Sequence, residues 1–242
     1  MNKTQFDRTK IIFNDKIDEL ASKSVAIVGI GGVGGFAVEA IARLGVGNII
    51  IIDKDIVDIT NLNRQIIALH STIGKNKTDV MEQRIKDINP NANVIKLMMF
   101  YNEETSHRLF ELKPDFVIDA CDTITAKKHI IKTCLEKRIK FITSMGAANK
   151  LDPTLITIST LDKTKEDKIA KVLRTTLRRE KVIGKVPVVY STERGFKAEI
   201  DKNQADVKNR KDLPLLGSVP YIPSIFGLMC ASYCAKTLLD DK

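Results

Sequence analysis

The sequence lacks the residue spacings that hold structural metals or disulfides. Its four cysteines are Cys121, Cys134, Cys230 and Cys234, and its three histidines are His70, His107 and His129. The cysteines form no Cys-x-x-Cys pairs, so we expect no zinc site. The histidines lack ligand spacing, and we expect each of them to have a structural rather than a catalytic role. Unpaired cysteines indicate a reducing compartment, and we predict a cytoplasmic protein whose cysteines are small buried hydrophobes.

Long uninterrupted apolar runs are also missing. The first residues, MNKTQFDRTK, do not resemble a signal peptide. The longest apolar segment, Tyr221–Leu239, is interrupted by Pro223, Gly227 and Lys236. This pattern predicts a core helix rather than a membrane span, and we expect no membrane partner.

Basic residues exceed acidic ones, 39 against 30, which gives a formal charge of +9. Residues 151–212 carry about +5 of this excess, with 15 Lys and Arg against 10 Asp and Glu. Helical spacing there places a basic stripe opposite an apolar one. The basic stripe is Lys171, Arg174, Arg178 and Lys181, and the apolar one is Ile169, Val172, Leu173 and Leu177. Such a stripe can bind nucleic-acid phosphates, but it is also typical of a solvated helix face.

A glycine-rich segment follows the first apolar run. The run SVAIV ends in Gly29-Ile30-Gly31-Gly32-Val33-Gly34, and a helix with one apolar face is expected after it. In a GxGxxG turn, the first glycine permits the tight turn, the second lets phosphate approach the backbone, and the third lets the helix pack on the strand. Gly29, Gly31 and Gly34 therefore predict a nucleotide site.

Polar residues after the second apolar run, NIIIID, favour ATP over a nicotinamide cofactor. Asp53 ends this run at the position of a ribose-binding carboxylate. Asn61, Arg64 and Gln65 follow, and Lys77 adds another cation. Several cationic donors suit a triphosphate under attack, whereas helix amides largely satisfy a dinucleotide pyrophosphate. On residue type alone, an ordinary solvated charge is the better interpretation of Lys77.

The run FVIDACD supplies Asp119 and Asp122 at the end of another predicted strand. Carboxylates at this end of a parallel strand face the ligand crevice, and an oxygen ligand with room for waters suits Mg²⁺.

The alternation of apolar runs and helical segments predicts a Rossmann-like α/β fold with a mostly parallel sheet, a C-terminal antiparallel β extension and a closing helix. The expected strands are 25–28, 49–52, 94–97, 116–118 and 141–143, and the expected helices are 33–44, 77–89, 103–112 and 126–138. Residues 155–158 and 186–190 are expected to form antiparallel strands over the carboxyl edge of the sheet. We expect a single domain, with a nucleotide-binding part at about 1–150, a substrate-facing extension at about 151–242 and a mobile loop at about 194–213.

The three motifs GIGGVG, IIDKDIVDITNLNRQIIALHSTIGKNK and VIDACD together resemble the ubiquitin-activating-enzyme-like adenylating family. The stretches TSMGAANKLDPT, VVYSTE and GSVPYIPSIFGLMCASY are similar to its tRNA threonylcarbamoyladenosine dehydratase branch. This resemblance implies that Gly29, Gly31 and Gly34 hold ATP, Asp53 the ribose, Arg64 and Lys77 the phosphates, and Asp122 the Mg²⁺. It places Asn61 and Gln65 near the nucleotide, and makes Arg64, Lys77 and Asp122 the catalytic set.

The resemblance also implies a homodimer in which Arg8 reaches the nucleotide site of the neighbouring subunit. The expected substrate is tRNA carrying threonylcarbamoyladenosine, bound along the basic stripe, and a sulfur-relay accessory protein is a possible partner. The expected reaction is ATP-dependent dehydration through an acyl-adenylate. The chain departs from the branch at Asn14, where a Gly is common, and at residues 165–168.

Three alternatives remain open from the sequence. A sulfur-carrier activator would adenylate a C-terminal Gly carboxylate, but the zinc cysteines common in that group are missing. A catalytically silent binding subunit would not need the intact set of Asp53, Arg64, Lys77 and Asp122. An NAD-dependent oxidoreductase would need a proton donor, such as a Tyr-x-x-x-Lys pair, near the crevice.

Overall fold

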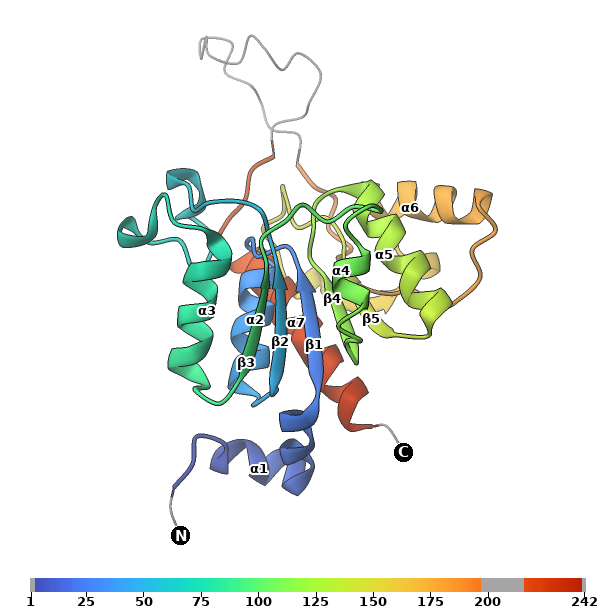
Figure 1. Ribbon diagram of the computed structural model, residues 1–242. Coiled ribbons are helices and arrows are strands. Elements are labelled where there is room, and N and C mark those ends of the chain that lie inside the picture. The colour runs from blue at the N-terminus through green and yellow to red at the C-terminus, as the bar shows by residue number, and fades with distance from the viewer. Residues whose placement is uncertain (1–2, 197–215, 241–242) are drawn as a thin grey trace.

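The computed structural model describes residues 3–196 and 216–240, and its centre is a seven-stranded sheet (Figure 1). The strand order is β3-β2-β1-β4-β5-β7-β6, and each neighbouring pair is parallel except β7 and β6. The strands are β1 Ser24–Val28, β2 Asn48–Ile52, β3 Asn93–Leu97, β4 Phe116–Asp119, β5 Lys140–Ser144, β6 Ile156–Thr160 and β7 Pro187–Ser191. This sheet confirms the predicted fold class.

Seven α-helices are present in the described part of the chain. They are α1 Asp7–Phe13, α2 Gly34–Arg43, α3 Lys77–Ile88, α4 His107–Phe110, α5 Ile124–Lys137, α6 Lys168–Arg179 and α7 Tyr221–Leu239. Residues 103–112, predicted as one helix, contain only the four-residue α4. Asn102 Oδ1 accepts from Thr105 N–H at 2.9 Å and Thr105 Oγ1 accepts from Asn102 N–H at 3.0 Å, the reciprocal pattern of a capping box. The chain therefore turns after Asn102 as predicted, but residues 103–106 form turns and only α4 is α-helical.

Helices cover both faces of the sheet because successive strand side chains point to opposite sides. Ile27 and Ile49 belong to the core under α2, α3 and α7, whereas Ala26 and Ile50 belong to the core under α4, α5 and α6. Burial on both faces explains why runs such as NIIII are continuously apolar.

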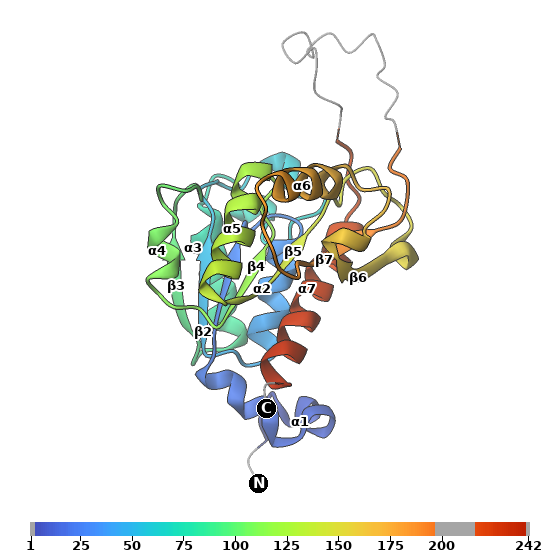
Figure 2. The same ribbon diagram turned by 90° about the vertical axis from the view of Figure 1, so that its right-hand side faces the viewer.

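The sequence analysis placed the antiparallel strand pair over the carboxyl edge of the sheet, and this prediction was wrong. β7 pairs with β5 through Thr143↔Val188 and Ser144↔Val189, so β7 and β6 widen the same sheet. The segment at that edge is α6, which lies at the end of the molecule opposite α1 (Figure 2). α6 thereby becomes a wall of the space above the strand ends.

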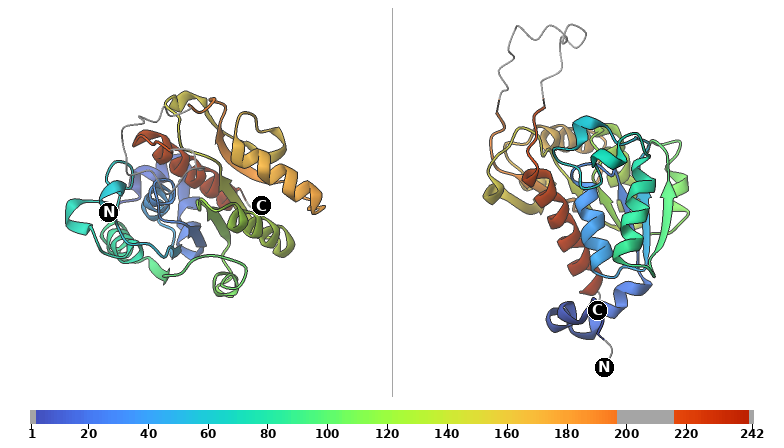
Figure 3. Two further views of the ribbon diagram at one scale, coloured as in Figure 1. Left: turned by 90° about the horizontal axis from the view of Figure 1, so that it is seen from above. Right: turned by 90° about the vertical axis from the view of Figure 1, so that its left-hand side faces the viewer.

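α7 is long and apolar enough for a membrane span, but 56% of its most apolar window is buried inside the protein. It lies beside α2 (Figure 3). A Cβ atom added to Gly227 would lie 2.2 Å from the Val33 carbonyl oxygen. α7 is therefore packed as a core helix, and at Gly227 its backbone lies close against the start of α2.

Gly227→Ala should lower the free energy of unfolding by about 1–3 kcal/mol, because the new methyl group forces the two helices apart. Leu228→Ala, at the adjacent exposed position, is the control and should change it by less than about 0.5 kcal/mol. Urea unfolding of the three proteins measures both values. Equal stability of Gly227→Ala and the wild type would contradict the close packing of α7 on α2.

Candidate functional site

A cleft with a volume of about 1620 Å³ lies at the carboxyl ends of β1, β2, β4 and β5. Sites for one small molecule are typically about 300–1,000 Å³, so this cleft has room for a nucleotide and a second reactant. The predicted residues that line it are Gly29, Gly31, Asp53, Asn61, Arg64, Gln65, Lys77, Asp122, Lys171 and Arg174. The fold thus brings together residues that are up to 145 positions apart in the sequence.

The glycine turn has the geometry that the motif predicts. Gly29 has φ +91°, which favours glycine, and a Cβ on Gly34 would lie 1.8 Å from the Gly29 carbonyl oxygen. A Cβ on Gly31 would meet no atom closer than Gln65 Nε2, at 4.0 Å. Gly29 and Gly34 are therefore needed for the turn and its packing. Gly31 leaves the backbone open to the cleft, where α2 begins without a side-chain cap.

Asp53 follows β2 directly and is fixed by backbone groups of two loops. Its Oδ2 accepts a hydrogen bond from Ile30 N–H at 2.6 Å, and its Oδ1 accepts one from Asp55 N–H at 2.9 Å. Each carboxylate oxygen has a further lone pair, and the side chain is half-buried at the cleft. The carboxylate can therefore accept hydrogen bonds from a ribose while it connects the glycine turn to β2.

The loop after β2 is built around the 3-10 turn Ile59–Asn61, which the Asp58 side chain caps. Arg64 extends from this loop, and its guanidinium donates to Thr60 O and Asn63 Oδ1, each at 2.9 Å. Arginine has five N–H donors, so others remain for an anion in the cleft. Gln65 Oε1 is buried and has no hydrogen-bond donor among the described residues. Such an atom at a cleft fits a ligand that supplies the donor.

Residue type alone favoured a solvated loop position for Lys77, but the side chain is buried. Lys77 is the first residue of α3, only 5% exposed, and its Nζ lies 3.0 Å from Asp55 Oδ2. A buried ammonium at the cleft can bind phosphate strongly, because water screens its charge little.

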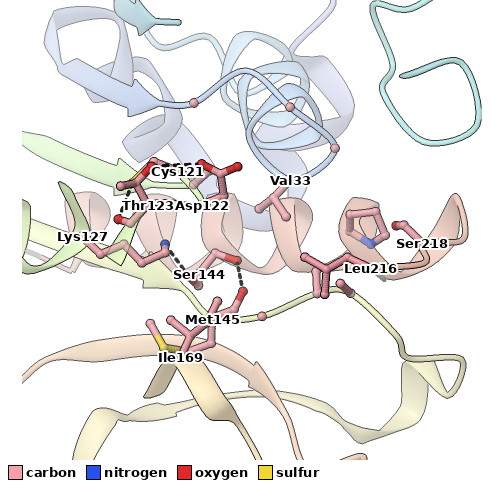
Figure 4. Close-up of a pocket in the computed structure, with 18 of the residues that line it drawn as sticks. Val33, Cys121, Asp122, Thr123, Lys127, Ser144, Met145, Ile169, Leu216 and Ser218 are labelled. Carbon is pink, nitrogen blue, oxygen red and sulfur yellow. Dashed lines mark hydrogen bonds between the residues drawn. The ribbon is translucent and has the colours of Figure 1, made fainter. Parts of the chain in front are cut away.

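Asp119 does not face the crevice, and this prediction was wrong. It is completely buried, and its Oδ2 lies 3.2 Å from Lys127 Nζ and accepts a hydrogen bond from Thr143 Oγ1. Lys127 Nζ also donates to Ser144 O at 2.7 Å (Figure 4). Burial lowers the pKa of Lys127, but Asp119 and other neighbours raise it above its ordinary value, so the ammonium stays charged.

The sequence analysis did not single out Lys127 as a site residue. The available signal was a lysine on the apolar face of the predicted helix 126–138, next to Ala126 and close to Ile130 and Ile131. A lysine at such a position is rarely buried unless it is paired.

Cys121 is hydrogen-bonded rather than a plain buried hydrophobe. Its thiol and its backbone N–H both reach Asp119 Oδ1, at 2.9 and 3.2 Å. Burial, together with the Asp119 charge, raises the pKa of Cys121 well above its ordinary value, so the thiol is protonated and a poor nucleophile at neutral pH. Cys134, Cys230 and Cys234 are buried as predicted, and burial raises the pKa of Cys230 to about 12.

Asp122 is the exposed carboxylate of this loop, and it points into the cleft beside Thr123 (Figure 4). Its Oδ1 accepts a hydrogen bond from Thr123 Oγ1 at 3.3 Å. In residues 3–196 and 216–240, no three His, Cys, Asp or Glu side chains are grouped as metal ligands. One carboxylate completed by nucleotide phosphates is a common way for a protein to hold Mg²⁺, and the Asp122 environment fits that arrangement.

The basic stripe is narrower than predicted. Lys171 and Arg178 on α6 are exposed, but the Arg174 guanidinium donates to Leu161 O and Thr164 O at 3.3 and 3.0 Å. Lys181 lies beyond the end of α6, with φ +54°.

Val172, which the sequence places on the apolar stripe of this helix, is not part of the core, since its side chain is 43% exposed. Ala170, Leu173 and Leu177 are the buried residues of α6. At 100° per residue, Val172 falls outside the arc that these three define.

Arg8 lies on α1, at the opposite end of the sheet from α6 and from the loops after the strands (Figure 2). It does not line the cleft of its own chain, and neither do Gly34, Arg178 and Lys181. A role for Arg8 at a nucleotide site therefore requires a second subunit.

Asn149 connects three segments at the mouth of the cleft. Its N–H donates to Gly217 O at 2.9 Å, its Oδ1 accepts from Gly217 N–H at 2.6 Å, and its carbonyl accepts from Phe196 N–H at 3.0 Å. Most of the predicted mobile loop at 194–213 lies outside the described residues. The adjacent Lys150 is another buried cleft residue that the sequence analysis missed.

Comparison with known proteins identifies the family. Residues 4–242 match the model of the ThiF family. The chain is 46% identical over 244 residues to the tRNA threonylcarbamoyladenosine dehydratase of Bacillus subtilis (strain 168), covering 98% of this chain and 95% of that protein. It is also similar to the crystal structures of E. coli tRNA N6-threonylcarbamoyladenosine dehydratase, TcdA, in complex with AMP and in complex with ATP. The TM-scores are 0.87 and 0.85, each at 32% identity over 98% of this chain and 94% of that one. The match over almost the whole chain shows that it belongs to the ThiF family.

Proposed function

We propose that this chain catalyses the ATP-dependent dehydration, by cyclisation, of threonylcarbamoyladenosine next to the anticodon of tRNA, through an acyl-adenylate. One observation carries the proposal. The open glycine turn, Arg64 and Lys77 line the same cleft, and this cleft is large enough for a second reactant beside the nucleotide. The similarity to dehydratases of this name along almost their whole length supports the substrate. The relative solved with ATP supports the nucleotide.

In the first step, an oxygen of the substrate carboxylate attacks the α-phosphorus of ATP. The bond from that phosphorus to the bridging oxygen breaks, and pyrophosphate leaves with the electron pair. Arg64 and Lys77 stabilise the charge that develops on the pyrophosphate. Asp122, with the ATP phosphates, would hold Mg²⁺, which supplies further positive charge when bound.

In the second step, a nucleophilic group of the same modified base attacks the mixed anhydride and expels AMP. One carboxylate oxygen leaves with AMP and a proton is released, so the nucleoside loses the elements of water. Ring closure within one molecule has a high effective molarity, so no protein nucleophile is required. The protonated thiol of Cys121 agrees with this mechanism.

The proposed enzyme is a cytoplasmic homodimer in which Arg8 of each subunit serves the nucleotide site of the other. A sulfur-relay protein remains a possible accessory partner. The exposed isoleucines of α1, Ile11 and Ile12, support a subunit contact at this helix, because α1 has no buried residue within its own chain.

Arg64→Ala and Lys77→Met should each slow adenylation by on the order of a hundredfold or more, because each variant loses a donor to the leaving pyrophosphate. Lys75→Met is the control, since Lys75 is exposed and lies two residues from Lys77 outside the cleft. Pyrophosphate release is measured with modified tRNA, with a sulfur-carrier protein and with neither. Near-normal rates in either cleft variant would overturn the phosphate assignment. Release that depends on the carrier protein alone would overturn the tRNA substrate.

Mixed dimers of Arg8→Ala and Asp122→Asn chains should regain activity that neither variant has alone. In such a dimer, one site receives Arg8 from the Asp122→Asn chain and keeps its own Asp122. The measurement is pyrophosphate release after unfolding and refolding the two chains together, with separately refolded chains as the control. If mixed dimers form and remain inactive, Arg8 does not act across the interface.

Reversing the two exposed cations of α6, with Lys171→Glu and Arg178→Glu together, should weaken tRNA binding and flatten its salt dependence. The log–log slope should change by about 0.7 to 0.9 for each tRNA phosphate that the variant no longer neutralises. Arg174 is left unchanged because its bonds to Leu161 and Thr164 hold the protein's own structure. Lys137→Glu with Lys185→Glu is the matched control, since both are exposed near the amino ends of β5 and β7. Equal tRNA binding by both double variants would make α6 an ordinary solvated face.

A further inference from the structure

Among the residues that the structure describes, three buried lysines line the cleft, and one of them has no ionic partner there. Lys77 is paired with Asp55 at 3.0 Å, and Lys127 with Asp119 at 3.2 Å. Lys150 is 5% exposed and forms no ion pair with any residue that the structure describes. The hydrogen-bond acceptor of its Nζ in the described chain is Glu193 O, at 2.8 Å. Because an ammonium has three N–H donors, Lys150 retains donors for a ligand.

Burying an ammonium without a neighbouring anion costs free energy, because the charge loses its hydration. The lowered pKa of Lys150 reflects this cost. Burial lowers the pKa of Lys150, and Asp167, Glu193 and Glu166 offset that effect only in part. Two of these carboxylates are already bound elsewhere. Asp167 accepts from Gly146 N–H and Ala170 N–H, and Glu193 accepts from Leu151 N–H and Asp152 N–H. An added anion would therefore be favourable at Lys150.

The position of Lys150 in the cleft separates it from the groups assigned to ATP phosphates. Lys150 lies on the loop after β5, whereas Arg64 and Lys77 belong to the loop after β2 and the start of α3. In the sheet, β1 and β4 lie between β2 and β5. The proposed reaction must bring a carboxylate anion up to an anionic triphosphate, and a fixed cation on the far side of the cleft would reduce that repulsion.

We propose that Lys150 binds the carboxylate of the acyl substrate and positions it for attack on ATP. This inference rests on the proposed function, because it assigns the anion at Lys150 to the reacting carboxylate. The contact of Lys150 with Glu193 O fixes the ammonium at the cleft wall. Lys150 then makes the site selective for a charged carboxylate over a neutral group of the same shape.

The test compares two RNA hairpins, one with threonylcarbamoyladenosine in the loop and one with its carboxamide analogue. The wild type should bind the carboxylate hairpin on the order of 10- to 100-fold more tightly, because hydrogen bonds to charged groups are strong. Lys150→Met should lose this preference and keep its ATP affinity. Lys165→Met is the control and should keep the preference, since Lys165 is a nearby exposed cation outside the cleft.

Two further measurements apply if Lys150→Met does not fold. Lys150→Gln removes the charge but can still donate to Glu193 O, and it should also lose the preference. In the unaltered protein, carboxylate binding should weaken as the pH rises through the lowered pKa of Lys150, because only the ammonium attracts the anion. Binding of the carboxamide hairpin should not change over that range. Asp167, Glu193 and Glu166 are the acidic groups whose charges act on Lys150 in this comparison.

The outcomes separate this inference from the proposed function. If the wild type converts the carboxylate hairpin with ATP, and a folded Lys150 variant still prefers carboxylate to carboxamide to the same extent, Lys150 is not the binding group. If the wild type neither binds nor converts the carboxylate hairpin or the full tRNA, the proposed function itself fails.

Discussion

The cleft depends on how closely three backbone segments approach one another at Gly29. Gly29 N–H donates to Ile52 O at 2.8 Å, and Ala120 N–H donates to Val28 O at 2.9 Å, so the strand ladder continues into the loops. A Cβ on Gly34 would overlap the Gly29 carbonyl oxygen, so a side chain there would push α2 away. The glycine turn, Asp53 and the loop that carries Asp122 are therefore held in fixed relative positions before any ligand arrives.

The buried pair of Asp119 and Lys127 adds a second constraint on the same loops. Asp119 holds Cys121 through two hydrogen bonds, and Lys127 holds the end of β5 through Ser144 O. A buried ion pair contributes little net stability, because desolvation offsets the attraction. Its effect here is geometric, since it sets the distance between the loop that carries Asp122 and the loop that leads to Lys150.

The sequence predicted the parts of the site in which a local pattern determines the geometry. GIGGVG after a run of β-branched residues is one example, because the turn needs glycine wherever it occurs. Asp53 is another, since its position at the end of a strand follows from the run before it. The ionic partners of Lys77 and Lys127 could not be read from the sequence, because only the fold brings Asp55 and Asp119 close to them. Lys150 was missed for a related reason, since its environment combines residues that follow β5 and β7 with residues at the start of α6.

The hydrogen bonds of Asn149 affect how much the length of the chain can vary between Phe196 and Gly217. Phe196 and Gly217, on the two sides of residues 197–215, both bond to this one residue. The cost of closing a loop grows slowly with its length, by about 0.6 kcal/mol for each doubling. Insertions or deletions between the two anchors would therefore change the closure cost little while Asn149 keeps both bonds. We therefore expect the distance along the chain between Phe196 and Gly217 to tolerate variation in length.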